Sequence, residues 1–478
     1  MKPSCKHPLL TLLNSCTTLH TLKQIHGQFI LNGLILHTYP ISRLLLVSSS
    51  LASISYTLAI FNRVLNPTIF LYNTLISSCI RNGHAQIALS LYHQVIAGPP
   101  HLEPNSYTFP SLFKAFGARE LFRHGAALHA HVVKFLQHPH DNFVQVSLLN
   151  FYSRCGRVDV ARYFFDRIVD PDLAAWNSIL SAYARISDYD EYFSLSCSGE
   201  EEEEEEEGII SSSMEVLNLF SLMQQKRSSS SMEPSELTLV ALIMACANLS
   251  ALSQGTWAHA YALRDTNNLR INHFMGTALI TLYSNCGSLH LASQLFSTLP
   301  LKDTFCFNAM IRGYAIHGYG HDALDLFETM KREGFAPDDF TMLGVISACS
   351  HVGLVDQGRK HFGSIADPKL EHYCSLVDLL GRSGLLEEAE EVILSMPLKP
   401  NAILWRCLLG GARVHGNAAI GETASRKLVE IEAETSGNYV LLSNLYADLK
   451  LWDDADRLRV EMKDEGISKV PGFSEVVV

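Results

Sequence analysis

The chain has 478 residues, of which 47% are hydrophobic, and its formal net charge at pH 7 is −12. This length exceeds one ordinary hydrophobic core, and the hydrophobic content excludes a wholly disordered chain. Net negative charge argues against a nucleic-acid partner, but eight acids form one run at 200–207, and without them the net charge is −4. Bulk charge therefore does not exclude nucleic-acid binding.

The N-terminal region, residues 1–68, is basic, and the first acidic residue of the chain is Glu103. A basic, acid-poor start is typical of an organellar import signal. Hydrophobic residues at helical spacing nevertheless begin by about residue 6. We expect that any targeting signal overlaps the first helical repeat.

A repeat becomes visible at residue 70. The stretch "FLYNTLISSCIRNG" returns as "AAWNSILSAYARIS" at 174 and "FCFNAMIRGYAIHG" at 305. Asn73 and Asn177 are 104 residues apart, and an insertion of about 27 residues accounts for the 131 residues between Asn177 and Asn308. The period divides into helical hairpins of about 37, 36 and 31 residues. One hairpin cannot bury its own apolar face, so the sequence predicts an all-α fold of hairpins stacked into an α-solenoid.

The insertion, about 186–213, contains the glutamate run and interrupts one hairpin between its helices. Its flanks, "SLSCSG" and "GIISSS", are typical of loops. We expect a solvated low-complexity loop on the outer edge of the solenoid, with a contact for a basic partner as the functional alternative. Further on, the uncharged stretch 237–263 contains several polar residues and favours two helices with a turn over a membrane span.

No catalytic motif stands out along the chain. There is no P-loop, HExxH, GxSxG or GxGxxG pattern, and the cysteines include no CxxC pair. The HxE at His101-Leu102-Glu103 lies between hairpins, and we interpret it as a loop. Several histidines recur at equivalent places in the repeats, which favours packing or capping over catalysis: His26, His129, His259, His317 and His415. We predict no catalytic residue, metal or cofactor.

These stretches resemble the pentatricopeptide repeat family of plants, in its subgroup with alternating standard, long and short motifs. The standard motifs are then 69–105, 173–235 and 304–338; the long motifs about 6–37, 106–141, 236–272 and 339–369; the short motifs about 38–68, 142–172, 273–303 and 370–401. Residues 69–401 form the main array, and residues 1–68 hold degenerate repeats. The segment 402–478 resembles the subgroup's C-terminal extension motifs. The resemblance implies a right-handed superhelix.

The resemblance also implies which residues read single-stranded RNA. The fifth and last residues of a motif face one base, and the second residues of adjacent motifs sandwich it. The base-reading residues would be Asn73, Asn105, Asn177, Ser235, Thr277, Asp303, Asn308 and Asp338, and the base-stacking candidates Phe70, Phe143, Phe274 and Phe305. The alternatives are that the polar residues only cap helices and turns, and that the phenylalanines are deeply buried.

Chemistry distinguishes the last residues of the motifs. An ionised Asp338 accepts hydrogen bonds and suits the N3–H of uracil, whereas Asn105 and Ser235 donate and suit the bare N3 of cytosine. Thr277 with Asp303 matches the family pairing for guanine. Two other short motifs depart from the family pattern, with Val146 and Asp172 in one and Ser42 and Thr68 in the other.

The function implied by this resemblance is recognition of a site for C-to-U RNA editing in a plant organelle, the mitochondrion or alternatively the chloroplast. Related proteins often continue into a deaminase domain with the pattern HxE followed by PCxxC, and no CxxC follows the HxE at 101–103 before the sequence ends at "PGFSEVVV". The protein would therefore not be an enzyme, and its expected partners are organellar RNA, a deaminase-bearing pentatricopeptide repeat protein acting in trans, and accessory editing factors. Splicing, stabilisation or translation of a transcript is one alternative; a protein-binding scaffold similar to a tetratricopeptide array is another.

Overall fold

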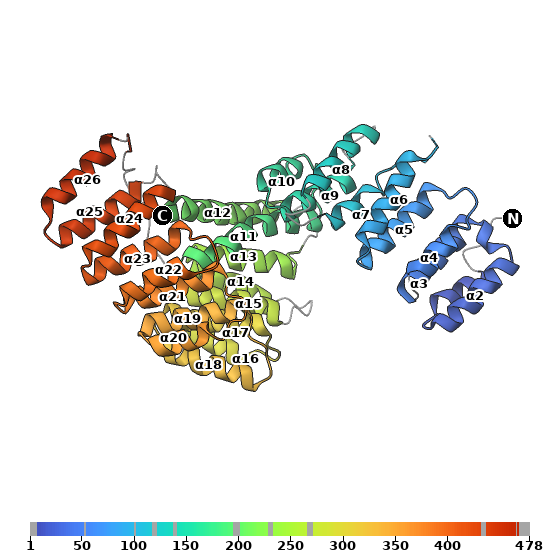
Figure 1. The fold of residues 1–478 in the computed structure, drawn as a ribbon. Helices are drawn as coiled ribbons and strands as arrows, with labels where there is room; N and C mark the ends of the chain where they lie inside the picture. Colours follow the sequence, from blue (N-terminus) through green and yellow to red (C-terminus); the bar gives the residue numbers. More distant parts are fainter. Residues whose placement is uncertain are drawn as a thin grey trace. The chain divides into compact units, whose positions relative to one another are not determined.

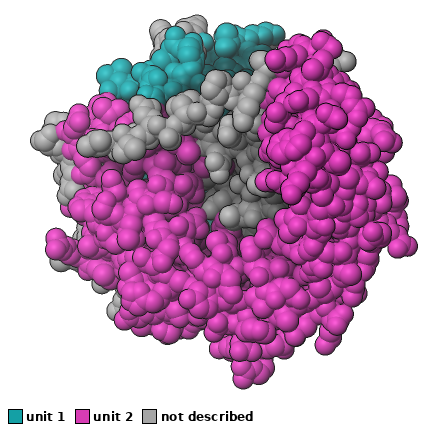
Figure 2. Space-filling view, turned by 90° about the vertical axis from the view of Figure 1, so that its left-hand side faces the viewer, with its two compact units in different colours: residues 1–182 teal, residues 183–478 magenta. Residues whose placement is uncertain are grey.

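The computed structural model describes residues 7–51, 54–99, 102–116, 122–136, 141–194, 201–227, 233–264, 271–431, 436–464 and 466–467. Within these ranges the regular secondary structure is entirely helical (Figure 1). The chain forms two compact units, residues 1–182 and 183–478, coloured teal and magenta in Figure 2. The predicted all-α class is confirmed.

The first unit consists of short helices in consecutive pairs. They are α1 (Pro8–Asn14), α2 (Leu19–Leu31), the 3-10 helix η1 (Leu34–Leu36), α3 (Thr38–Leu51), α4 (Ile54–Phe61), α5 (Ile69–Arg81), α6 (Ala85–Ala97), α7 (Phe109–Ala115), α8 (Phe122–Phe135), α9 (Asn142–Arg154) and α10 (Val158–Phe165). Helix α11 (Leu173–Ser194) begins in this unit and continues past residue 182.

The second unit continues the same pattern. Its helices are α12 (Glu201–Arg227), α13 (Glu236–Asn248), α14 (Leu252–Arg264), α15 (His273–Asn285), α16 (Leu289–Thr298), α17 (Thr304–Ile316), α18 (Gly320–Arg332), α19 (Asp339–Val352), α20 (Val355–Phe362), α21 (Leu370–Arg382), α22 (Leu386–Ser395), α23 (Ala402–His415), α24 (Ala418–Ile431), α25 (Ser436–Asp448) and α26 (Trp452–Asp464).

The first helices of successive hairpins stack side by side in each unit. Helices α3, α5, α7 and α9 contact one another in sequence, as do α13, α15, α17, α19, α21 and α23. The even-numbered partners form a second layer, as Figure 1 shows for α18, α20 and α22. Helices α5, α9, α15, α17, α19 and α21 begin at or within one residue of the predicted motif boundaries, so the repeat period does define the stacked unit.

Apolar side chains between the layers hold the stack together. Leu379, Leu380, Leu404 and Leu408, from α21 and α23, are all fully buried. Each such side chain stabilises the fold by roughly 1.5–3 kcal/mol relative to an exposed one. The two helices approach closely at Gly381 and Gly411, since a Cβ added to Gly411 would lie 2.8 Å from the Gly381 Cα.

The glutamate-rich insertion was expected to be a loop, and this prediction is wrong for its described residues. Helix α11 extends to Ser194, and α12 begins at Glu201, within the glutamate run, and includes the "GIISSS" flank. Glutamate has a high helix propensity, and its negative charge is favourable at a helix N-terminus. Further along α12, Val216 and Leu219 are fully buried and attach this helix to the second unit.

The uncharged stretch 237–263 forms α13 and α14, so the predicted pair of helices is confirmed. Among the described residues, no helix is long and apolar enough to cross a membrane.

Candidate nucleic-acid interface

In the first standard motif, the fifth and last residues are hydrogen-bonded to each other. Asn73 Nδ2, on α5, donates to Asn105 Oδ1 at 2.9 Å. The hydroxyl of Thr108, the third residue of the next motif, donates to Asn73 Oδ1 at 2.8 Å and accepts from the Asn105 backbone N–H at 3.0 Å. The backbone N–H of Tyr107 donates to the same Asn105 Oδ1 at 3.1 Å. Three side chains from two motifs thus form one network.

The third standard motif repeats this arrangement in the second unit. Asn308 Nδ2 donates to Asp338 Oδ1 at 2.9 Å, and the Thr341 hydroxyl donates to Asn308 Oδ1 at 2.6 Å. The Asp338 backbone N–H donates to Thr341 Oγ1 at 3.1 Å, and the Thr341 N–H donates to Asp338 Oδ1 at 2.8 Å. The recurrence that the sequence shows in Asn73 and Asn308 is therefore a recurrence of geometry.

Each network leaves one polar group of its last residue unused. A backbone N–H can only donate, so the Tyr107 N–H fixes the oxygen side of the Asn105 amide and turns Nδ2 away. In the second unit, the bonds to Asp338 all engage Oδ1 and leave Oδ2. No described residue bonds to either group. The first network therefore offers a donor to a ligand, and the second offers an acceptor.

The capping alternative is also correct for several last residues. Ser235 and Asp338 each form a capping box with the threonine three residues later, and Asp303 caps α17 by accepting from the Cys306 N–H at 3.0 Å. In Asp338, capping and the bond from Asn308 use the same oxygen. Capping therefore coexists with an unused polar group.

The second standard motif is divided between the two units. Asn177 lies on α11 in the first unit, and Ser235 precedes α13 in the second. The Ser235 backbone N–H donates to Thr238 Oγ1 at 3.0 Å, which matches the arrangement at Asn105 and Asp338.

The short motif with Thr277 and Asp303 has a different geometry. No hydrogen bond joins these two side chains; instead, each contacts Cys306, with Thr277 Oγ1 3.3 Å from its sulfur. Asp303 Oδ2 lies 3.9 Å from His273 Nε2. In another short motif, Ser42 is buried and its hydroxyl donates to the Tyr39 carbonyl at 2.8 Å, so it is poorly placed to meet a base.

The four stacking candidates all lie at the surface. Exposed fractions are 52% for Phe70, 54% for Phe143, 47% for Phe274 and 61% for Phe305, so the alternative of deep burial is wrong. Sequence reasoning did not single out other exposed apolar residues at the same second position: Tyr39, Tyr107, Leu237 and Phe340. The motif register alone would have identified them. The rings of Tyr107 and Phe143, from adjacent motifs, are 6.0 Å apart.

The recurring histidines serve packing, as predicted. In three long motifs the imidazole Nδ1 pairs with a tyrosine hydroxyl: His26 with Tyr56 at 2.8 Å, His129 with Tyr152 at 2.8 Å and His259 with Tyr283 at 2.7 Å. Burial lowers the pKa of each of these histidines. Within the described residues, no group of three or more metal-binding side chains occurs. His101 lies outside the described residues, and Glu103 is exposed.

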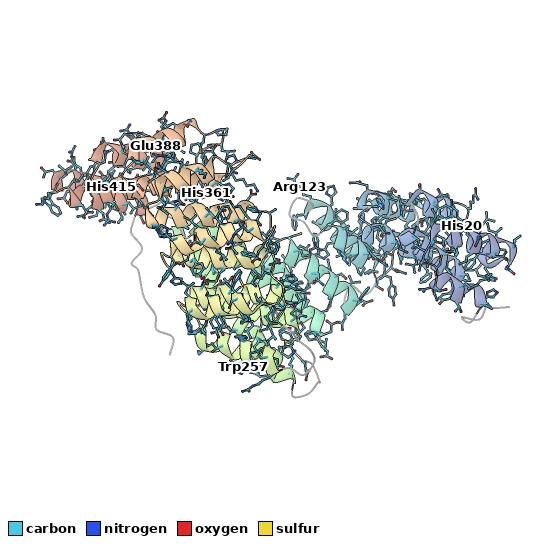
Figure 3. The ribbon with its side chains drawn as sticks, turned by 90° about the horizontal axis from the view of Figure 1, so that it is seen from below. His20, Arg123, Trp257, His361, Glu388 and His415 are labelled. Atoms are coloured by element: carbon cyan, nitrogen blue, oxygen red, sulfur yellow. The ribbon has the colours of Figure 1, made fainter. Side chains whose placement is uncertain are left out.

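Two other histidines connect neighbouring repeats. His317 Nε2 lies 2.7 Å from the Ser284 carbonyl, and His415, labelled in Figure 3, lies 3.0 Å from the Arg382 carbonyl. Both carbonyls are in the last turn of the preceding first helix, and the Ser284 carbonyl also accepts from the Gly287 N–H just past that helix. The predicted capping role is confirmed, although the helix that is capped belongs to the preceding repeat.

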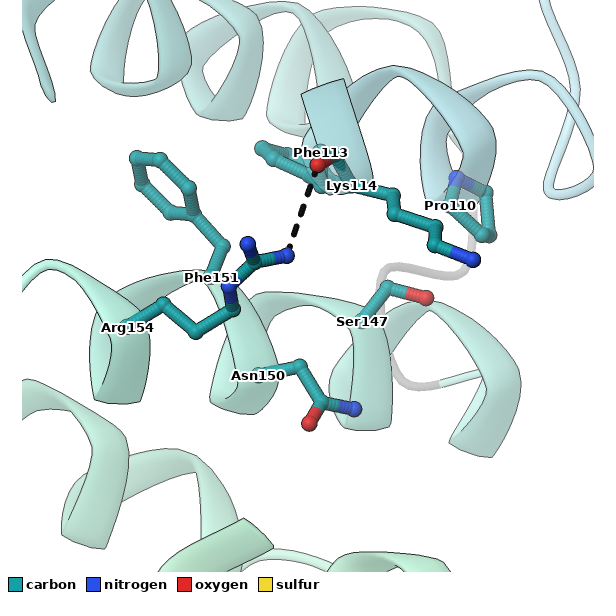
Figure 4. Close-up of a pocket in the computed structure, with 7 residues that line it drawn as sticks. All are labelled: Pro110, Phe113, Lys114, Ser147, Asn150, Phe151 and Arg154. Carbon is teal, nitrogen blue, oxygen red and sulfur yellow. Dashed lines mark hydrogen bonds between the residues drawn. The ribbon is translucent and has the colours of Figure 1, made fainter. Parts of the chain in front are cut away.

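A basic pocket of about 280 Å³ lies between α7 and α9 in the first unit (Figure 4). Lys114, Ser147, Asn150 and Arg154 supply its polar groups, and Pro110, Phe113 and Phe151 the remainder. Arg154 Nη1, on α9, donates to the backbone carbonyl of Lys114, on α7, at 3.5 Å, which places the Arg154 side chain next to α7. Such a pocket favours an anionic group.

Stacked helical hairpins with recurring polar networks define a helical-repeat protein, and similarity to known proteins specifies the family. Models described as PPR repeat match residues 70–97 and 371–399, one described as PPR repeat family matches 302–351, and one described as E motif matches 415–477. A pentatricopeptide repeat-containing protein of Arabidopsis thaliana is 47% identical over 98% of both chains. A second from that plant is 35% identical, covering 98% of this chain and 76% of its own. The chain belongs to the pentatricopeptide repeat family, in the subgroup that carries an E motif.

Among solved structures, the crystal structure of the pentatricopeptide repeat protein PPR10 from maize is similar with a TM-score of 0.50. The match covers 93% of this chain and 61% of that chain at 16% identity, so the likeness concerns the fold.

Proposed function

We propose that the protein binds single-stranded RNA with sequence specificity and selects a site for C-to-U editing in a plant organelle. The observation that carries the proposal is the recurring network at Asn73–Asn105 and Asn308–Asp338, in which the last residue keeps one polar group unused. Solenoid repeats can read one base each through two or three side chains. The adjacent exposed rings supply the stacking surfaces that such reading needs.

The unused groups support a specific base for each network. The Asn105 amide would donate to the bare N3 of a pyrimidine such as cytosine, and Asp338 Oδ2 would accept from the N3–H of uracil. From the 5′ to the 3′ end, the motifs would select a pyrimidine at Asn73–Asn105, cytosine at Asn177–Ser235, guanine at Thr277–Asp303 and uracil at Asn308–Asp338, with one nucleotide for each motif.

The distribution of charge removes the objection raised by the net charge of −12. Residues 1–182 carry 14 Lys and Arg against seven acids, a net charge of +7, so the remaining residues account for −19. The basic pocket of Lys114 and Arg154 lies in this positive unit. We propose that the first unit contributes most of the phosphate contacts, and that the acidity of the rest of the chain belongs to surfaces away from RNA.

The E motif at 415–477 supports an editing role, since the subgroup that carries it is associated with editing. The described part of this segment forms helical hairpins that continue the array. A deaminase-bearing pentatricopeptide repeat protein acting in trans would supply the chemistry, with accessory editing factors bound to the array. We propose a mitochondrial location on the family resemblance; relatives in Arabidopsis thaliana include both chloroplastic and mitochondrial proteins.

Two experiments test the proposal. Purified protein should bind an RNA with the four bases at the spacing of their motifs more tightly than a scrambled RNA of the same composition, and equal affinity would contradict base reading. Organellar cDNA from a loss-of-function plant should show one or a few unedited cytidines. If editing is normal but splicing or transcript abundance is defective, the protein acts in splicing or stabilisation of a transcript and not in editing. Failure to bind any RNA would favour a protein-binding scaffold.

A further inference from the structure

Each described long motif after a standard motif has a fully buried threonine as its third residue. These are Thr108, Thr238 and Thr341, all with an exposed fraction of 0%. A buried hydroxyl without a partner is costly, so the partners of each threonine show its role. In all three, the hydroxyl accepts from the backbone N–H of the preceding motif's last residue: Asn105, Ser235 and Asp338, at 3.0, 3.0 and 3.1 Å.

The remaining hydroxyl hydrogen determines how the reading amide is oriented. A hydroxyl has one hydrogen, and its shortest acceptor is Oδ1 of the fifth residue: 2.8 Å to Asn73 and 2.6 Å to Asn308. This bond holds the amide with its oxygen toward threonine and its Nδ2 toward the last residue. A flipped amide would place its NH₂ against the threonine hydroxyl hydrogen and its oxygen against the oxygen of Asn105 or Asp338, which is repulsive.

We propose that Thr108 and Thr341 are specificity-determining positioning residues, and that each base reader consists of three residues spanning two motifs. The threonine orients the fifth-residue amide. The amide then occupies Oδ1 of the last residue, so the group of the last residue that is left for a base is Asn105 Nδ2 in one network and Asp338 Oδ2 in the other. The long motif thereby contributes to reading by the standard motif before it. This inference rests on the proposed RNA-binding function and deepens it.

The test measures base discrimination by the full chain with and without the hydroxyl. The probes are two RNAs that differ only by uracil or cytosine at the nucleotide assigned to Asn308–Asp338. We expect the unaltered protein to prefer uracil by about tenfold, and Thr341→Val to reduce this ratio to about threefold or less. Thr341→Ser keeps the hydroxyl and should retain the ratio within about twofold. The control, Thr298→Val, makes the same chemical change at an exposed position at the end of α16.

The readout separates positioning from simple stabilisation. A threonine that only caps α19 would lower the unfolding temperature in Thr341→Val while leaving the uracil-to-cytosine ratio unchanged, and that result would overturn the inference. If Thr341→Val does not fold, Thr108→Val in the first unit provides the same test. The two RNAs then differ by a pyrimidine or a purine at the nucleotide assigned to Asn73–Asn105. If the unaltered protein shows no base preference, the proposed function fails; if it discriminates and both valine variants discriminate equally well, only the present inference fails.

Discussion

Asn308 Nδ2 donates a hydrogen bond of 2.9 Å to Asp338 Oδ1, and this bond joins the two ends of one repeat motif. The equivalent bond between Asn73 and Asn105 is also 2.9 Å long. The two networks therefore differ mainly in the group that the last residue leaves unused, a carboxylate oxygen in one and an amide NH₂ in the other. Under the proposed function, this difference makes the base preferences of the two networks separable by single substitutions.

Asp338→Asn should shift the base preference of the third standard motif from uracil toward cytosine. The Thr341 N–H and Asn308 would hold the new Oδ1 in place, so the substitution replaces the unused acceptor by a donor. We expect a change of roughly 1–3 kcal/mol in discrimination, measured as the ratio of dissociation constants for matched RNAs. Asp325→Asn, on an exposed site of α18, is the control. An unchanged ratio would argue against Asp338 as a base reader.

Phe305→Ala should weaken RNA binding by about 1–3 kcal/mol, with little dependence on the base, because stacking uses the ring face common to all bases. Stability should change little, since the ring is 61% exposed. Tyr319→Ala removes a ring of similar exposure, 54%, from the turn before α18 and should leave affinity unaltered. Equal losses in the two variants would exclude a specific stacking role for Phe305.

Gly411→Ala should destabilise the C-terminal hairpins, because its Cβ would lie 2.8 Å from the Gly381 Cα and force α21 and α23 apart. We expect a loss of about 1–3 kcal/mol in the free energy of unfolding. Gly410→Ala is a matched control. No atom of another helix lies within 4 Å of its added Cβ, so the higher helix propensity of alanine should stabilise the protein by about 0.5–1 kcal/mol. Chemical denaturation of the unaltered protein, Gly411→Ala and Gly410→Ala measures both the expected loss and the expected gain in the free energy of unfolding.

Stability should fall as the pH is lowered below about 6.5. Burial holds the pKa of His26, His129 and His259 below the ordinary value of 6.5. Below pH 6.5 the unfolded chain therefore binds more protons than the folded chain, and stability is lost until the folded histidines also titrate. Unfolding between pH 8 and 5 measures this effect.

His259→Gln should flatten part of this pH dependence, because it removes one buried titrating group. A profile as steep as that of the unaltered protein would assign the dependence to other groups.

The amino-acid sequence by itself determined the class of fold and the starts of α5, α9, α15, α17, α19 and α21, because a fixed repeat period places equivalent residues at equivalent points of each hairpin. It did not predict that the glutamate run enters α12, since helix propensity and the buried stripe around Val216 outweighed a loop-like composition.

Only the tertiary structure decided which groups are available to a ligand. Exposure of the second-position rings depends on how neighbouring hairpins stack. The unused group of Asn105 depends on the bond from the Tyr107 N–H, and that of Asp338 on the bond from the Thr341 N–H, both in the following motif. A sequence pattern gives residue types at a spacing. It does not show which of two oxygens, or which side of an amide, is already occupied, because this depends on contacts between separate repeats.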